Sequence, residues 1–488
     1  MVRIGTDEGT LVYGAVRIVQ GQVFARDFFE VMGPGTFYWL AAFFKLFGVT
    51  FLAARICLFV TSLGTFILMY FLSQRVCGRY QFLPALLLVG AYFSTIWPMV
   101  NHHVDSNFFG LLSIALMVLW RQKSRNVLLF AAGAVAGITT CIIQPKGILL
   151  LLAFIGWIWI QQRSQSGWWL STLRIMVGYC GVLGLTGLYF WSHGALRELL
   201  YMNFIWPSQH YSKVNVVPYA LGLRQYWSHW TIQPHGLPWM VPLAIILFVP
   251  YLLAAVLPAL VPLLGLPLRA DNLRPQILLY WLCGWAMWLS EIHRRDIGHL
   301  VAASPLLIIL CIHFLVEYRA KIANSVLQFL AVCAGSLAAV NLLLVFSAPS
   351  VHTRAGNVAM FKKAPALEFL DSHLAPGTTM FAYPYSPMYY FLSGTNNPTR
   401  YSLLVYNYNT PSQFLDVIQT LDREKVKYVL WNTKFYATAD IFNFAPAAKR
   451  SSSSLILEPY LESHYRVVAD FNGMRIMERK VNPNGDQR

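Results

Sequence analysis

The chain has 488 residues, of which 57% are hydrophobic and only 12% are charged. A mean hydropathy of +0.50 excludes an ordinary soluble domain of this length, because its surface would have to expose large apolar patches. The net charge of +16 comes from Lys and Arg residues scattered between apolar runs, which favours membrane loops and contact with anionic lipid over nucleic-acid binding. We therefore expect a polytopic α-helical membrane protein that contacts membrane lipids and binds no nucleic acid.

Residues 1–50 are polar, acidic and punctuated by glycine. Apolar residues recur at helical spacing from Leu11 to Val19, and Gly21 follows as a stop signal. A second apolar run, Phe37 to Phe47, is too short to span a membrane unaided. Both runs predict amphipathic helices that lie in the outer membrane interface.

Three carboxylates stand out in this segment. Asp7 and Glu8 begin the first predicted helix, and Asp27 lies in the turn between the two helices. The simplest interpretation is that Asp7 and Glu8 form a solvated helix cap and that Asp27 is a turn residue. The alternative is that these carboxylates, with Glu30 nearby, form part of a site where chemistry takes place.

The rest of the first 349 residues contains long apolar runs. They predict about ten membrane spans, near residues 51–73, 82–99, 105–120, 127–143, 147–161, 174–192, 239–262, 276–290, 299–316 and 325–346. The seven cysteines (Cys57, Cys77, Cys141, Cys180, Cys283, Cys311 and Cys333) lie in or beside these runs without a C-x-x-C pair, so they predict apolar packing and neither a disulfide frame nor a metal site.

The loops between the predicted spans alternate between short basic loops and loops with few basic residues. The positive-inside rule assigns the basic set to the cytoplasm. Residues 1–50, the 193–238 loop and everything after 347 are then exterior or periplasmic. Because an even number of spans leaves both ends outside, we expect a further span upstream of the given sequence.

Residues 350–488 change character, since the charge rises and the long apolar runs stop. A helix is predicted from Pro411 to about Lys425, followed by a strand at 427–432. Two strands at 465–471 and 474–479 flank Asn472-Gly473, a strong two-residue hairpin signal. These patterns predict a small exterior α/β domain, distinct from a membrane domain formed by residues 1–349.

The outer loop after the second predicted span contains Asn101-His102-His103-Val104-Asp105. Two histidines and an aspartate suggest a metal, but adjacent histidines cannot easily aim at one ion, and no other Cys/His cluster accompanies them. We favour Asp105 as a polar group that lines a cavity shared with the first loop. No cofactor is expected, and a divalent metal is left open.

Basic residues also occur on the predicted outer side. Lys146 must reach the interface or an anion, because a charge left in hydrocarbon costs several kcal/mol; simple snorkelling is the alternative. Arg294 and Arg295, with His299 nearby, favour an anionic partner such as a phosphate. Carboxylates that could deprotonate an acceptor, opposite cations that could stabilise a leaving phosphate, indicate group transfer from a lipid-linked phosphate donor.

The run D-E-G-T-L-V-Y-G-A, followed by G-Q-V-F-A-R-D-F-F and G-P-G-T-F-Y-W-L-A-A-F-F-K-L-F-G, resembles the first exterior loop of the GT-C superfamily of multi-spanning glycosyltransferases. The protein O-mannosyltransferase-like and lipid A aminoarabinose transferase-like bacterial enzymes belong to it. The resemblance continues through Asp105, Lys146-Gly147 and R-R-D-I-G-H-L-V-A-A-S-P, and so covers nearly the whole chain.

The resemblance implies inverting transfer of a hexosyl or pentosyl group from a polyprenyl-phosphate donor to an unknown glycan, lipid or protein acceptor outside a bacterial inner membrane. It also implies the site residues. Asp7 is the general base, assisted by Glu8, and the substrates are bound by Asp27, Asp105, His103, Lys146, Arg294, Arg295 and His299.

Three other functions compete with the transferase. A flippase or transporter for lipid-linked sugars also needs a cavity lined by acids and cations, although its polar residues should lie nearer the membrane midplane. An oligosaccharide polymerase would be a transferase with different donors. A non-catalytic anchor for residues 350–488 would not need ten spans.

Overall fold

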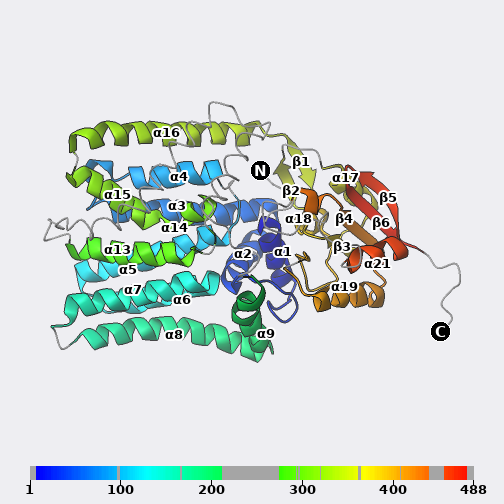
Figure 1. Cartoon of the computed structure of the whole chain (residues 1–488), viewed down its shortest axis with the longest axis horizontal. Coiled ribbons are helices and arrows are strands. Elements are labelled where there is room, and N and C mark those ends of the chain that lie inside the picture. The colour runs from blue at the N-terminus through cyan, green and yellow to red at the C-terminus, as the bar shows by residue number, and fades with distance from the viewer. Residues whose placement is uncertain are drawn as a thin grey trace.

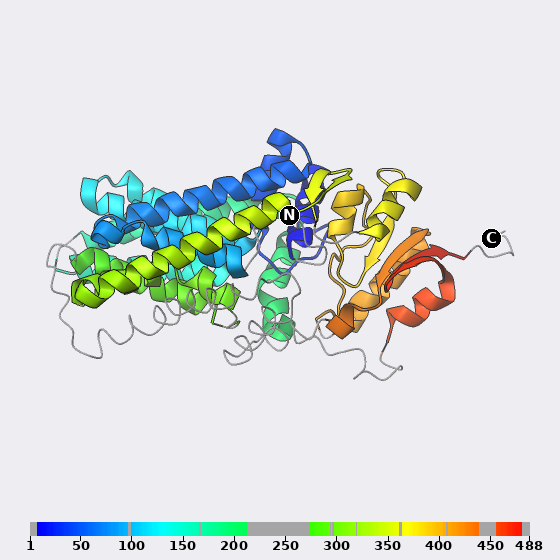
Figure 2. The ribbon, with the colours of Figure 1, turned by 90° about the horizontal axis from the view of Figure 1, so that it is seen from above.

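The computed structural model describes residues 7–95, 99–164, 167–211, 274–292, 294, 297–318, 320–360, 364–406, 408–438 and 455–480. Long helices lie side by side in a bundle at one end of the molecule, and a smaller α/β unit lies at the other end (Figure 1). The first helices of the chain lie between these two parts (Figure 2).

The bundle contains helices at nine of the ten predicted spans. They are α3 (Phe51–Ser73), α4 (Leu83–Thr95), α5 (His102–Lys123), α6 (Val127–Ile142), α7 (Gln144–Gln162), α8 (Trp168–Ser192), α13 (Arg274–Ser290), α14 with α15 (Ile297–Ala303 and Pro305–Tyr318) and α16 (Ala320–Ser347). The tenth segment, 239–262, lies outside the described residues. The 299–316 segment was expected as one helix, but it is divided at Ser304 because Pro305 starts a new helix.

Four of the described helices, α3, α5, α7 and α8, are long and apolar enough to cross a membrane by themselves. The count of about ten spans therefore stays a prediction. Close packing in the bundle depends on small residues, because a Cβ atom added at Gly133 or Gly178 would lie 2.0 Å or 2.1 Å from a backbone oxygen of the facing helix. These glycines let α6 and α8 pack backbone to backbone.

The N-terminal segment contains α1 (Asp7–Val19) and α2 (Pro34–Phe47). We expected α1 to lie in the membrane interface, but all its residues from Glu8 to Ile18 are buried. The protein itself covers the face expected to meet water: Tyr13 packs on Tyr390 with ring centroids 4.7 Å apart, and its hydroxyl accepts a 2.7 Å hydrogen bond from the Asn397 backbone N–H. The interfacial prediction for α1 was therefore wrong.

The α/β unit contains two sheets. Strands β1 (Ser350–Thr353) and β2 (Gly356–Ala359) form a hairpin, and a second sheet has the order β3-β4-β6-β5. In that sheet β3 (Met380–Tyr383) is parallel to β4 (Tyr428–Asn432), which pairs antiparallel with β6 (Met474–Arg479). The predicted hairpin of β5 (Tyr465–Phe471) and β6 is confirmed, with Asn472 and Gly473 at φ 56° and 91° as its turn requires.

Short helices complete the described structure. They are η1 (Gly78–Tyr80), α9 (Leu196–Leu200), η2 (Tyr201–Ile205), η3 (Pro207–Tyr211), α17 (Pro365–His373), α18 (Met388–Ser393), α19 (Pro411–Arg423), α20 (Phe435–Thr438) and α21 (Leu457–His464). The predicted helix at 411–425 is confirmed as α19, which begins with a capping box between Thr410 and Gln413. The side chains of α1 and α2 share one apolar core with this unit, so the N-terminal segment is held by residues nearly four hundred positions later.

Candidate functional site

The Asp7 carboxylate lies exposed at the first turn of α1. Its Oδ1 accepts a 2.7 Å hydrogen bond from the Tyr385 hydroxyl, which lies within 3.4 Å of the Thr10 hydroxyl. Tyr385 is buried, and burial, followed by the charge of Asp7, raises the pKa of its hydroxyl, so the hydroxyl stays a proton donor toward Asp7. Asp7 is thus both oriented by the protein and reachable from outside.

Glu8 is buried, with 1% of its surface exposed, whereas the adjacent Asp7 is exposed. Its carboxylate forms a two-oxygen ion pair with the Arg55 guanidinium of α3 and accepts a 2.8 Å hydrogen bond from the Val100 N–H. Glu8 therefore ties α1 to α3 and to the segment before α5. An acid held in this way positions neighbouring groups and is poorly placed to accept a proton from a substrate.

Glu30 lies in the same region and is also buried. Burial, with a smaller contribution from the charge of Asp7, raises its pKa to about 8, while Ser402 and Arg17 act in the opposite direction. Its Oε1 has no hydrogen-bond partner among the described residues. At neutral pH Glu30 is therefore protonated, so it adds no negative charge beside Asp7.

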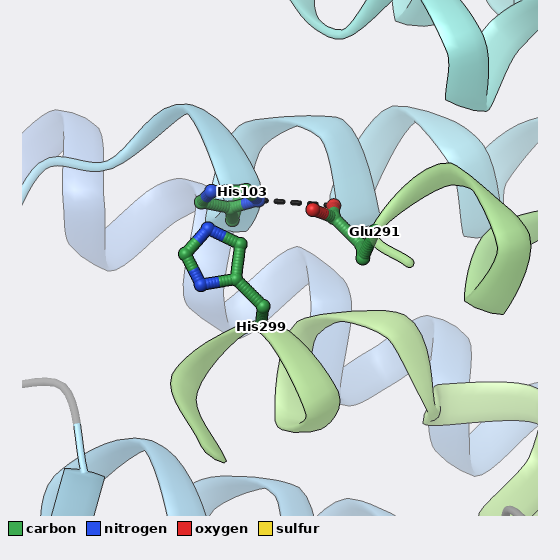
Figure 3. Close-up of side chains that lie close together, drawn as sticks. All are labelled: His103, Glu291 and His299. Carbon is green, nitrogen blue, oxygen red and sulfur yellow. Dashed lines mark hydrogen bonds and ion pairs between the residues drawn. The ribbon is translucent and has the colours of Figure 1, made fainter. Parts of the chain in front are cut away.

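Four side chains from three parts of the sequence form what we call the buried ionic cluster: His103, Lys146, Glu291 and His299. Figure 3 shows three of them, His103, Glu291 and His299. Glu291 Oε1 lies 3.0 Å from His103 Nδ1 and 3.1 Å from Lys146 Nζ. The His103 and His299 rings meet edge to face, with their centroids 4.6 Å apart. The Lys146 ammonium is 0% exposed and also donates to the Ser106 hydroxyl at 2.9 Å and to Asn107 at 3.1 Å.

This arrangement replaces the snorkelling alternative for Lys146. A lysine that snorkels would extend its ammonium to the interface, whereas this one turns inward and is compensated by Glu291. Local signals define the starts of the two helices that carry His103 and Lys146. Asn101 accepts a 2.8 Å hydrogen bond from the His103 N–H and so caps α5, and Pro145 lies in the first turn of α7.

The cluster also contains the one group of possible metal ligands among the described residues. Ligand atoms of His103, Glu291 and His299 lie within 4.8 Å of one another. The sequence showed no other Cys/His cluster beside the 102–103 pair, but the fold brings the single His299 against His103. A divalent metal nevertheless does not fit these residues, because the Lys146 ammonium already compensates the single carboxylate and would repel a second cation.

Asp105 lies on the same helix as His103, and its carboxylate is buried beside Thr36 and Thr61. These threonines belong to α2 and α3, so Asp105 faces those two helices, whereas His103 faces the buried ionic cluster. Its Oδ2 has no hydrogen-bond partner among the described residues. That it lines a substrate cavity stays a prediction.

Asp27 lies beyond the other end of α1 from Asp7. Its carboxylate forms a 2.8 Å ion pair with Arg26 and accepts a 2.6 Å hydrogen bond from the Val23 N–H. The hydrogen bond from Arg26, together with that from Val23, holds its pKa below the usual range. The geometry is that of a turn residue, and the structure does not bring Asp27 together with Asp7.

Arg294 follows Glu291 in a turn closed by a 3.1 Å hydrogen bond from its N–H to the Glu291 carbonyl. With Glu291 and His299 it lines a small surface depression beside the buried ionic cluster. Arg295 lies outside the described residues. The structure thus brings Lys146, His103, His299 and Arg294 into one neighbourhood, as their shared outer location led us to expect.

Four residues that shape the site received no role from the sequence. Tyr385 and Arg55 contact Asp7 and Glu8, Glu291 compensates Lys146, and Glu30 is buried near Asp7. Glu291 carried a usable signal, since an ionisable residue at a predicted membrane edge is a candidate for a charged partner. Tyr385 carried none, because one tyrosine among many in the α/β unit has no distinguishing pattern.

The fold and the site define a class: a membrane protein in which an N-terminal helix that begins with two acids lies between a helical bundle and an α/β unit. The crystal structure of ArnT from Cupriavidus metallidurans bound to undecaprenyl phosphate is similar, with a TM-score of 0.54 and 13% identity over 97% of this chain and 93% of that one. The apo oligosaccharyltransferase of Archaeoglobus fulgidus gives a TM-score of 0.52 and 13% identity over 95% of this chain and 69% of that one.

Both of these proteins are GT-C superfamily membrane glycosyltransferases, so the chain has the GT-C fold. The resemblance found in the sequence is confirmed at the level of the fold. No protein-family model matches the chain, and neither does any curated protein sequence.

Proposed function

We propose that the chain is a membrane glycosyltransferase that moves a sugar from a polyprenyl-phosphate donor to an acceptor on the outer side of the membrane. The observation that carries the proposal is the Asp7 carboxylate, which is exposed at the head of α1 and oriented by Tyr385. The proposal is also supported by the fold shared with ArnT, whose crystal structure contains undecaprenyl phosphate.

In the proposed reaction an acceptor hydroxyl or amine attacks the anomeric carbon of the donor sugar. Asp7 takes the proton of the attacking group as the new bond forms. The bond between the anomeric carbon and the phosphate oxygen breaks, and polyprenyl phosphate leaves with the electron pair. Attack from the side opposite the leaving phosphate inverts the anomeric configuration.

The leaving phosphate gains negative charge, so it needs fixed cations. Lys146, Arg294 and Arg295 are the proposed phosphate-binding set, with His103 and His299 as further donors. Glu291 keeps the Lys146 ammonium at a fixed place in the buried ionic cluster, 3.1 Å from its own carboxylate. Glu8 is proposed to position Asp7 through Arg55, and no step requires a metal.

The test uses the full chain reconstituted in liposomes with radiolabelled polyprenyl-phosphate sugars and candidate glycan, lipid and peptide acceptors. Asp7→Asn should lower transfer at least about 100-fold, the usual contribution of a general base. Glu424→Gln is the matched control, because Glu424 lies exposed at the end of α19, has no role in the proposed site and should leave most activity intact. Equal losses in both variants would contradict the assignment of Asp7.

The same liposomes separate the competing functions. Movement of intact labelled lipid across the bilayer without transfer would identify a flippase and overturn the proposal. Transfer that yields a ladder of growing oligosaccharides, instead of a single addition, would identify a polymerase. That result would be compatible with Asp7 as the general base, but it would contradict the proposed addition of a single sugar.

A further inference from the structure

A second concave surface lies at the other end of α1 from Asp7. It is a groove of about 350 Å³, a size that fits a small ligand, formed by the 21–26 turn, one side of α2 and the end of α8. Ile18, which forms part of its wall, and Asp7 are eleven residues apart on one helix, which corresponds to about 17 Å. The groove is therefore separate from the proposed reaction centre.

The polar side chains of the groove favour an anion. Arg26, Lys45 and His193 line it, and none of its lining residues is a carboxylate. Arg26 is partly neutralised by Asp27, with which it pairs at 2.8 Å, whereas no hydrogen bond or ion pair of the exposed Lys45 ammonium occurs among the described residues. His193 uses its Nδ1 toward the Tyr189 carbonyl, which leaves Nε2 for a ligand.

The surroundings of the groove favour a lipid as the source of that anion. Tyr38 and Tyr189 line it with their hydroxyls 3.2 Å apart, and tyrosines of this kind are typical of the level of lipid headgroups. Directly beside it, α8, which is long and apolar enough to cross the membrane, exposes Leu185, Leu188 and Trp191 at 70%, 57% and 67%. An acyl chain can follow this apolar surface while the headgroup occupies the groove.

We propose that this groove binds the phosphate headgroup of an anionic glycerophospholipid, with Lys45 as the main cation and the acyl chains against α8. The ligand is a membrane lipid and takes no part in sugar transfer. A bound lipid would bridge α1, α2 and α8, which all line the groove. This inference does not depend on the proposed reaction.

Native mass spectrometry of the delipidated full chain in detergent tests the proposal, with phosphatidylglycerol as the anionic probe and phosphatidylcholine as the zwitterionic one. Wild type should retain phosphatidylglycerol preferentially, and Lys45→Gln should weaken retention about fivefold, which corresponds to about 1 kcal/mol per basic side chain near anionic lipid. Lys45→Arg should restore it. Lys123→Gln, in the last turn of α5, is the matched control and should bind like wild type.

Three results would overturn the proposal. Equal retention of the two lipids would exclude recognition of charge, and equal retention by Lys45→Gln and Lys123→Gln would exclude this groove. Displacement of phosphatidylglycerol by inorganic phosphate alone, at matched ionic strength, would identify a soluble phosphate as the ligand. Thermal unfolding of each variant in the same detergent shows whether a loss of binding reflects a loss of fold.

Discussion

The Tyr385 hydroxyl donates a 2.7 Å hydrogen bond to the Asp7 carboxylate, and so joins residues that are 378 positions apart. The bond connects the α/β unit to the head of α1. It fixes one oxygen of a carboxylate that would otherwise rotate freely at the molecular surface. In the proposed reaction this leaves the other oxygen for the acceptor proton.

Tyr385→Phe should therefore lower kcat about tenfold, since a hydrogen bond to a charged group contributes about 1.5–3 kcal/mol. The donor KM should change little, because Tyr385 does not belong to the proposed phosphate-binding set. Initial rates of sugar transfer at varied donor concentration measure both constants. Tyr389→Phe is the matched control, because no hydrogen bond of its hydroxyl occurs in the described residues; equal losses in both variants would contradict the positioning of Asp7.

Local signals in the sequence were enough for several elements. The span 51–73 coincides with α3, and Asn472-Gly473 gave the β5–β6 hairpin its correct limits. Both depend on interactions between residues close in the sequence: a continuous apolar run with a Thr50 cap, and a turn that needs two positive φ angles. Such elements are predictable because nothing distant competes with them.

The site was predictable only in part. The sequence indicated that Asp7 and Lys146 belong to a polar region on one side of the membrane. It could not show that α1 is buried, because the residues that cover it, such as Tyr385 and Tyr390, come from the far end of the chain. Nor could it pair Lys146 with Glu291, because pairing across helices depends on their packing, which periodicity does not contain.

The ion pair between Glu8 and Arg55 should matter for stability more than for chemistry. Glu8 is 1% exposed, so Arg55→Met would leave a buried carboxylate whose remaining partner among the described residues is the Val100 N–H. We expect destabilisation of about 3 kcal/mol, as for other buried pairs that lose one member. Thermal unfolding in detergent measures the change.

The double variant Glu8→Gln/Arg55→Met supplies the control for this pair. Because this variant removes the Glu8 charge as well as Arg55, it should be more stable than Arg55→Met alone. If the destabilisation of the double variant equalled the sum for Glu8→Gln and Arg55→Met, the two side chains would not be coupled. The predicted contribution of the ion pair would then be wrong.

Lys146 combines a structural role with a proposed donor-binding role, and two variants separate them. Lys146→Met should be destabilised by about 3 kcal/mol, because Glu291 would lose its main cation in a buried site. Lys146→Met/Glu291→Gln should regain most of this stability. Its donor KM should nevertheless stay about tenfold above the wild-type value, because no cation remains at that place to meet the phosphate. Recovery of both stability and donor KM in the double variant would show that Lys146 has a structural role alone.

Glu30 should make stability depend on pH in a defined window. Its pKa is raised from 4.5 to about 8 in the folded protein, mainly by burial. Between these values the unfolded chain releases the proton while the folded protein keeps it, so the free energy of unfolding falls as pH rises from about 4.5 to 8 and levels off above. The whole effect is about 5 kcal/mol at most, at 1.36 kcal/mol per pKa unit.

Glu30→Gln should remove this dependence. The variant should match wild type near pH 5 and unfold at a higher temperature at pH 8, because its side chain needs no proton to stay neutral. Arg17 remains hydrogen-bonded to Gln22, Thr399 and the Asp27 carbonyl, so losing the Glu30 charge does not leave it without acceptors. Glu424→Gln, at an exposed position, should show no such change. A constant difference between Glu30→Gln and wild type across pH 5 to 9 would mean that Glu30 does not change protonation on folding, and that the charge near Asp7 is shared by two carboxylates.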